Sequence, residues 1–255
     1  MSWRVVGASR IGTSHTSTGV PCQDSNWSWP GCSADGRAVL CVFAADGAGT
    51  APEGRAGAEK AMEATAAFLV PRIQAGQAID ETLLSACAAH VAAKVREVAA
   101  AAGLAPRDFA CTYLGVVCCE NASTIVQIGD GGVVLGGTDG LEMPIAPMNG
   151  EYANMTNFIT DDDLGPLRVV SLPGRFDRVA VFTDGIQRLA VDLTSNVPHT
   201  PFFSGFFTVL AGAMPEDEDR LHDALLGFLG CPAVESRTDD DTTLVLAVRT
   251  AVEGE

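Results

Sequence analysis

The residues Ala38–Ala45 (AVLCVFAA) form a continuous apolar run that stops at the pair Asp46-Gly47. The run is partly β-branched and aromatic, and no polar residue interrupts it. Such a segment predicts a strand that is buried on both faces rather than on one. This strand is therefore expected to lie in the interior of the fold.

The segments on either side of this strand predict an α+β fold. Helical patterns cover Pro52–Ile73 and Asp80–Ala102, the second ending at Gly103. Further strands are predicted at Trp3–Ser9, Phe109–Cys118, Ser123–Ile128, Val133–Leu135, Arg178–Phe182 and Leu244–Arg249, and further helices around Phe202–Ala213 and Pro215–Leu229. Because few helices separate the later strands, this order favours two mostly antiparallel sheets with helices outside.

The composition indicates one large folded domain over residues 1–255. The chain has 47% hydrophobic and 19% charged residues, which is typical of a protein with a sizeable core. One segment, Met143–Leu167, contains three prolines and the acidic run Asp161–Asp163, and we expect a flap-like excursion there.

The charge and the cysteines restrict the environment of the protein. A net charge of −16 disfavours nucleic acid and anionic membranes as partners, because both carry negative charge. Several of the eight cysteines lie in apolar runs and none forms a CxxC pair, which predicts reduced thiols. With no signal-like N-terminus and no apolar run of ~18 residues, the expected location is the cytoplasm.

Aspartates stand at the ends of four predicted core strands. Asp46, Asp130 and Asp184 each follow a strand and precede a glycine, and Asp240 comes shortly before the last strand. One Asp-Gly pair usually marks a turn, but four carboxylates at the ends of buried strands can converge on one point. Carboxylates that lie close together stay ionised only when a cation binds among them. The pattern thus predicts a site for a divalent cation that prefers oxygen ligands.

Taken in order, the motifs resemble the bacterial form of the PP2C family of metal-dependent serine/threonine protein phosphatases. The matching segments are Gly19–Asp24 (GVPCQD), Ala45–Gly49 (ADGAG), Ala110–Thr112 (ACT), Ile128–Asp130 (IGD), Phe182–Gly185 (FTDG) and Asp240–Thr243 (DDTT). Each motif is weak alone, but the ordered set spans nearly the whole chain. The resemblance implies the family's four-layer αββα sandwich, with residues 143–167 in the place of the family's flap.

The resemblance also implies roles for individual residues. Asp46 matches the carboxylate that bridges two metal ions, and the carbonyl of Gly47 joins it on the second ion. Asp184 and Asp240 match ligands of the first ion, and Asp130 matches a ligand of a third, weaker ion. The resemblance further implies an acid at Asp24 that orients water. Two or three Mn²⁺ or Mg²⁺ ions would then activate a bridging water that attacks phosphoserine or phosphothreonine.

The sequence departs from the family pattern at three positions. Gln23 stands where many members have an acid, Ala48 where eukaryotic members have a proton-donating histidine, and Gly19 where many have a phosphate-binding arginine. His15, in the same loop as Asp24, is a candidate for the missing donor. Arg10 and Arg55 are other candidates for binding phosphate, although Arg55 fits a helix surface better.

Several alternatives remain at this point. The departures allow a catalytically weak member that binds phosphoproteins and acts as a regulator. An N-terminal nucleophile hydrolase using Ser2 is disfavoured because Ser2 precedes the first strand, and the acidic runs lack the spacing of a calcium-binding EF-hand loop. The expected partners of a phosphatase are phosphorylated proteins, with a serine/threonine protein kinase or its target as the candidate.

Overall fold

Two five-stranded antiparallel sheets form the centre of the molecule in the computed structural model, which describes residues 2–147 and 156–250. We call them the β12 sheet and the β3 sheet. The β12 sheet has the order β1 (Ser2–Arg10), β12 (Thr242–Thr250), β9 (Arg178–Phe182), β6 (Gly132–Gly137) and β7 (Gly140–Glu142). The β3 sheet has the order β2 (Ser25–Cys32), β3 (Ala38–Ala45), β4 (Tyr113–Cys118), β5 (Ala122–Ile128) and β8 (Arg168–Pro173).

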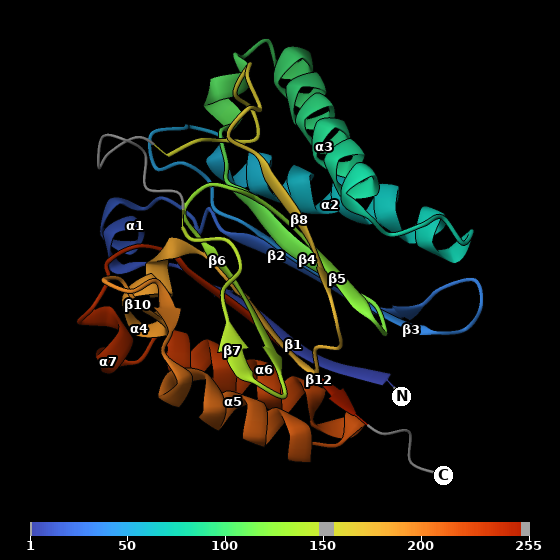
Figure 1. Cartoon of the computed structure of the whole chain (residues 1–255). Helices are drawn as coiled ribbons and strands as arrows, with labels where there is room; N and C mark the ends of the chain where they lie inside the picture. The colour runs from blue at the N-terminus through green and yellow to red at the C-terminus, as the bar shows by residue number, and fades with distance from the viewer. Residues whose placement is uncertain (1, 148–155, 251–255) are drawn as a thin grey trace.

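Helices cover the outer face of each sheet (Figure 1). The long helices α2 (Gly54–Gln74) and α3 (Glu81–Ala102) pack on the β3 sheet, and α5 (Thr200–Gly212) and α6 (Glu218–Leu229) pack on the β12 sheet. The shorter elements are α1 (Thr13–Thr18), η1 (Pro106–Phe109), η2 (Asp184–Ile186), α4 (Gln187–Ala190), β10 (Val191–Asp192), β11 (Val197–Pro198), η3 (Pro215–Asp217) and α7 (Pro232–Glu235). The order of layers is the expected αββα sandwich.

The strand β3 contributes side chains to two of the apolar interfaces between the layers. Its odd-numbered residues, such as Cys41 and Phe43, join the core between the β3 sheet and the helices α2 and α3. Its even-numbered residues, such as Leu40 and Val42, join the core between the two sheets. Successive side chains of a strand point to opposite faces, so a strand in this position must be apolar throughout. The prediction of burial on both faces is confirmed.

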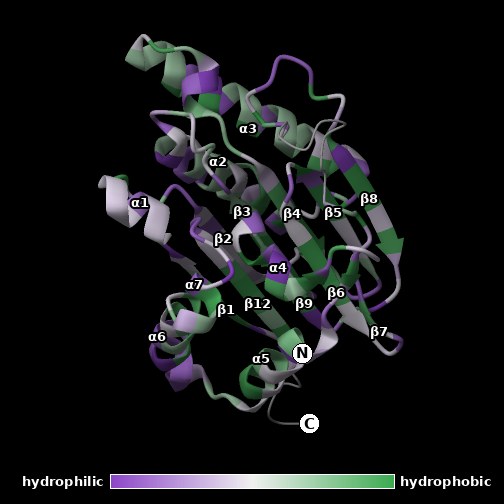
Figure 2. Cartoon of the chain, turned by 90° about the vertical axis from the view of Figure 1, so that its left-hand side faces the viewer, coloured by the Kyte–Doolittle hydropathy of each residue, from purple (hydrophilic) through white to green (hydrophobic). Residues whose placement is uncertain are grey.

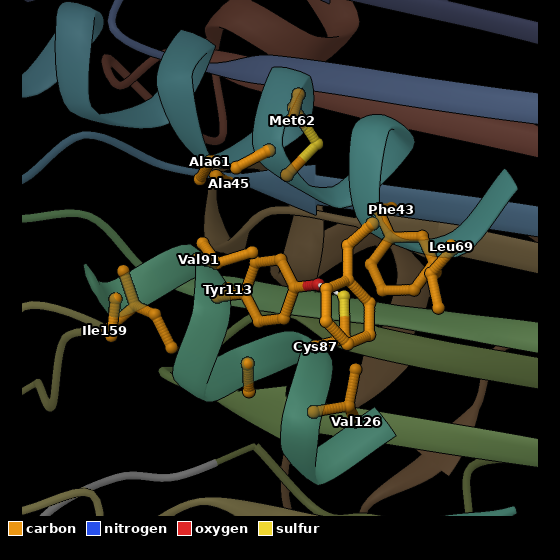
Figure 3. Packing of buried hydrophobic residues seen from close by; sticks show 14 of the residues in the cluster. Phe43, Ala45, Ala61, Met62, Leu69, Cys87, Val91, Tyr113, Val126 and Ile159 are labelled. Atoms are coloured by element: carbon orange, nitrogen blue, oxygen red, sulfur yellow. Dashed lines mark hydrogen bonds between the residues drawn. The ribbon is translucent and has the colours of Figure 1, made fainter. Parts of the chain in front are cut away.

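Tyr113 shows how the core under α2 and α3 accommodates a polar atom (Figure 3). Its side chain is fully buried, and its hydroxyl hydrogen-bonds with Thr65 Oγ1 at 2.9 Å and lies 3.5 Å from Cys87 Sγ. A buried hydroxyl without such partners would be destabilising by about 1–3 kcal/mol. All eight cysteines are free, as the sequence predicts.

The sequence did not predict the edge strands β2 and β8 or the short helix α1. The strand β2 (SNWSWPGC) contains Pro30 and Gly31, and β8 ends at Pro173. Both strands lie at edges of the β3 sheet, where one side of the backbone has no partner strand and proline is tolerated.

The expected flap falls partly on residues 148–155, which lie outside the described part of the chain. Within the described ranges, no helix combines the length and apolarity that a membrane span requires.

Candidate metal centre

Strand pairing brings the predicted aspartates to one end of the sandwich. In the β12 sheet, Phe182 pairs with Leu244, so the end of β9 and the start of β12 meet there. In the β3 sheet, Ser25 pairs with Ala45, which places Asp24 beside Asp46. Figure 2 looks onto this end, with α1, α4 and α7 around it, opposite the ends of the described chain in Figure 1.

Close backbone packing explains two of the glycines that follow the aspartates. A Cβ atom on Gly185 would lie 1.9 Å from the carbonyl oxygen of Asp241, and one on Gly47 would lie 2.5 Å from the carbonyl carbon of Gly54. Neither glycine has a positive φ. Turn geometry is therefore not what these positions require. They need a residue without a side chain so that the neighbouring segments can approach.

Crowding of carboxyl groups sets the electrostatics of the site. Burial raises the pKa of Asp46 well above its ordinary value, and three neighbouring carboxylates raise it further. These neighbours are Asp24, Asp184 and Asp240. Burial likewise raises the pKa of Asp184 to about 7, with contributions from other carboxylates of the site. A group of acids that repel one another in a poorly hydrated place is typical of a cation site.

Asp24 links the two sheets at this end. Its Oδ2 accepts hydrogen bonds from Thr183 Oγ1 at 2.7 Å and from Thr243 Oγ1 at 2.6 Å, and both threonines belong to the β12 sheet side. Burial raises the pKa of Asp24 to about 7, although these two hydrogen bonds act in the opposite direction. The sequence motifs FTDG and DDTT contain both threonines, but their role is visible only once the strands are paired.

Three buried oxygens of the site have no hydrogen-bond partner among the residues that the structure describes. They are Asp24 Oδ1, Asp184 Oδ1 and Gln23 Oε1. Buried polar atoms normally have partners, so these oxygens have the free capacity that a hydrated cation requires. Over residues 2–147 and 156–250, no group of three or more acidic, histidine or cysteine side chains is placed so that it could hold a metal ion as it stands. The donor set is nevertheless all oxygen, which suits Mg²⁺ or Mn²⁺.

Asp130 lies next to this group and contacts the segment after the flap. Its Oδ2 accepts a hydrogen bond from Thr156 Oγ1 at 3.0 Å, and its backbone carbonyl accepts one from Gln187 Nε2 at 3.0 Å. Repulsion from Asp130 contributes to the raised pKa of Asp184. The described end of the predicted flap therefore reaches the candidate metal centre.

The loop before β2 places His15 at the rim of the site. His15 Nδ1 lies 2.9 Å from Oδ2 of Asp241, a buried residue for which the sequence predicted no role of its own. Gly19, at the position of the family's arginine, has φ 73° and ends α1 in a left-handed conformation. Glycine adopts this conformation far more readily than arginine.

The two arginine candidates do not point to a phosphate site. Arg55 pairs with Glu59, one turn further along α2, with Nε and Oε1 2.8 Å apart. This is the expected surface position on a helix. Arg10 packs against Gly230, where a Cβ atom would lie 2.8 Å from its guanidinium carbon.

Known proteins are similar to this chain in both sequence and fold. The family model described as protein phosphatase 2C matches residues 11–229. Serine/threonine-protein phosphatase 3 of Escherichia coli (strain K12) is 46% identical over 250 residues, covering 97% of this chain and 99% of the relative.

Solved structures agree with the layered fold. A bacterial serine phosphatase has a TM-score of 0.64 at 14% identity, covering 98% of both chains. The Staphylococcus aureus phosphatase Stp1 has a TM-score of 0.63 at 14% identity, covering 98% of this chain and 95% of its own. The catalytic domain of the phosphatase PstP, solved in complex with two manganese ions, has a TM-score of 0.58 at 18% identity over 98% and 99% of the two chains. At these identities the likeness concerns the fold.

Proposed function

The chain belongs to the protein phosphatase 2C family, and from that premise we propose that it hydrolyses phosphoserine and phosphothreonine in proteins, with divalent cations in the aspartate site. One observation carries the proposal. Asp24, Asp46 and Asp184 converge from two sheets and repel one another. Asp24 and Asp184 each have a buried oxygen without a partner in the described part of the chain. A fold maintained for binding alone would have no need of such crowding.

The proposed ligands are those that the family pattern implies. Asp46 and the carbonyl of Gly47 would hold one cation, and Asp46, Asp184 and Asp240 would hold another. Asp130 with Asp184 would hold a third. Asp240 lies at the exposed rim of the site, and its pKa is raised by partial burial of the carboxyl and by repulsion from Asp241. The described segment after residue 155, together with Met143–Pro147, would form the two ends of the flap.

The remaining residues of the site act on water and on the leaving group. When bound, the cations supply Lewis acidity, which lowers the pKa of water and offsets the charge of the phosphoryl group. Asp24, held at Oδ2 by two threonines, presents Oδ1 as an acceptor that orients the attacking water. Gln23 Oε1 offers a second, uncharged acceptor. His15 is the proposed proton donor to the serine or threonine oxygen.

The alternative of a catalytically weak phosphoprotein-binding regulator is less well supported. It rests on the departures at Gly19, Gln23 and Ala48. The similarity to a curated phosphatase extends over almost the whole of both chains, and it favours the enzyme. Phosphorylated proteins, such as a serine/threonine kinase or its target, are the proposed substrates. The eight free cysteines fit a reducing, cytoplasmic location.

A direct test uses p-nitrophenyl phosphate and a phosphothreonine peptide with Mn²⁺, with Mg²⁺ and with a chelator. We expect turnover that requires a cation and falls at least about 100-fold in Asp46→Asn, because a bridging carboxylate would be lost. Asp219→Asn, an exposed acid on α6, is the matched control and should retain wild-type activity. Turnover that is unchanged by the chelator would refute the proposal.

A further inference from the structure

Asp241 is the most heavily bonded carboxylate of the site that the proposed metal ligands do not include. It is 2% exposed and directly precedes β12. Its Oδ1 accepts from the Gly12 backbone N–H at 2.7 Å, and its Oδ2 accepts from the Gln23 N–H at 2.6 Å. Oδ2 also lies 2.9 Å from Nδ1 of His15. One buried side chain thus holds both ends of the loop that carries His15 and Asp24.

The backbone next to His15 contacts the same segment of the chain as its side chain does. Ser14 N–H donates to the carbonyl of Asp239 at 2.9 Å, and a Cβ atom on Gly12 would lie 2.3 Å from the carbonyl carbon of Asp240. The loop therefore rests directly on the segment that enters β12. The His15 ring is near enough to Asp240 that a positive charge on it lowers the pKa of that carboxyl.

The chemistry of the pair fixes the orientation of the imidazole. The Asp241 carboxylate already accepts hydrogen bonds from two backbone N–H groups, and a carboxylate oxygen accepts rather than donates. Nδ1 of His15 therefore carries the hydrogen of this contact. The other ring nitrogen, Nε2, has no hydrogen-bond partner within residues 2–147 and 156–250, and the side chain is 15% exposed. A buried aspartate that binds one nitrogen of a histidine sets its tautomer and stabilises the imidazolium ion.

We propose that Asp241 is a positioning residue that directs Nε2 of His15 toward the leaving oxygen of the phosphorylated serine or threonine. The inference rests on the proposed phosphatase function and adds a residue to it. As the oxygen of water bonds to phosphorus, the bond from phosphorus to the serine or threonine oxygen breaks. The leaving oxygen keeps the electron pair and takes the proton from Nε2. Bulk solvent takes the proton of the water and returns one to His15.

The expected signature is a dependence on the leaving group. p-Nitrophenolate leaves without a proton, whereas the alkoxide of threonine does not, and a general acid typically contributes 10²–10⁴-fold. We expect His15→Asn to lower kcat on a phosphothreonine peptide by about 100-fold and to change turnover of p-nitrophenyl phosphate by less than about threefold. Asparagine keeps an amide near the position of Nδ1, so the contact with Asp241 can persist while Nε2 is lost.

Asp241→Asn should show the same selective loss. The double variant should be no slower than the slower single variant, because the two substitutions remove the same function. His222→Asn is the matched control, since His222 Nδ1 also contacts one acceptor, the Gly7 carbonyl at 2.9 Å, but outside the site. This control should retain full activity on both substrates.

A second readout needs neither metal nor substrate. Nδ1 of His199 and of His222 each faces a backbone carbonyl, which only accepts, so long-range ¹H–¹⁵N spectra of the metal-free protein should show a protonated Nδ1 for both. They should also show one further protonated Nδ1, which is that of His15 against Asp241. His15→Asn should remove that signal, Asp241→Asn should shift it, and His222→Asn should leave it in place.

Two results would overturn the inference while leaving the phosphatase function intact. In the first, His15→Asn shows equal losses on both substrates, or none, which can be measured even if Asp241→Asn does not fold. In the second, Asp241→Asn slows both substrates equally, as expected of a purely structural carboxylate. A wild-type protein without metal-dependent turnover would instead overturn the proposed function, and this inference with it.

Discussion

Replacing Asp184 by asparagine should stabilise the protein in the absence of metal. The pKa of Asp184 is raised from 3.8 to about 7, because the carboxyl is buried and has acidic neighbours. The folded state thus binds more protons than the unfolded state between these two values. The free energy of unfolding therefore falls as the pH rises through this interval, and above it the ionised carboxylate is fully destabilising.

The magnitude follows from the same shift. Each pH unit between the two values corresponds to about 1.4 kcal/mol, which gives an upper bound of ~4 kcal/mol at pH 8. Asparagine leaves a buried amide without partners, which offsets about 1–3 kcal/mol of that gain. We expect Asp184→Asn to be about 2 kcal/mol more stable than the wild type at pH 8 without metal. At pH 5, where the wild-type carboxyl is mostly protonated, this advantage should disappear.

Urea unfolding at the two pH values, with a chelator and with Mn²⁺, measures these differences. At a Mn²⁺ concentration of about 100 Kd the wild type should gain about 2.7 kcal/mol, and the variant much less, so the order of stability reverses. The exposed Asp219→Asn should follow the wild type throughout. A variant that is less stable than the wild type at pH 8 without metal would refute the reasoning, and so would a difference that does not change with pH.

Three further substitutions test other parts of the site. Thr183→Val removes one of the two hydroxyl donors to Asp24, so urea titrations should show a free energy of unfolding lower by about 1–3 kcal/mol. An unchanged free energy of unfolding would show that this hydrogen bond does not stabilise the protein. Gln23→Glu adds a charge beside buried acids, so calorimetry should show about tenfold tighter Mn²⁺ binding and thermal unfolding a less stable metal-free protein. Arg96→Ala removes the guanidinium donor to the Thr160 carbonyl, so proteolysis should cleave near residue 160 faster. Unchanged cleavage would show that Arg96 does not hold this segment.

The layered fold could be predicted because its central strand has an unusual sequence. β3 contacts apolar partners on both faces, and this demand leaves an unbroken apolar run in the chain. The helix α3 was equally clear from its apolar stripe at helical spacing and from Gly103, which ends it. In the structure Asp80 also caps its start by accepting a hydrogen bond from Leu83 N–H at 2.9 Å. β2 was missed because an edge strand tolerates proline and half-buried polar residues.

The predicted aspartates were visible because strand ends are marked in the sequence by the change from apolar to acidic residues. Their proximity agrees with the prediction, whereas their roles as metal ligands stay a prediction. The contacts of Asp24 with Thr183 and Thr243 join residues 159 and 219 positions apart. No local pattern encodes such a distance. The same holds for Asp241, which differs from its two acidic neighbours only in where β12 places it.

The pairing of β1 with β12 along nine residues, from Ser2 opposite Thr250 to Arg10 opposite Thr242, has a consequence for synthesis on the ribosome. The β12 sheet needs β12 between β1 and β9, so a nascent chain that has not yet exposed β12 lacks the centre of this sheet. It also lacks Asp240 and the carboxylate that holds the His15 loop. We therefore expect the strand order to determine the order of folding. The helices α2 and α3 can pack early on the β3 sheet, but the site can become active only after β12 has been added.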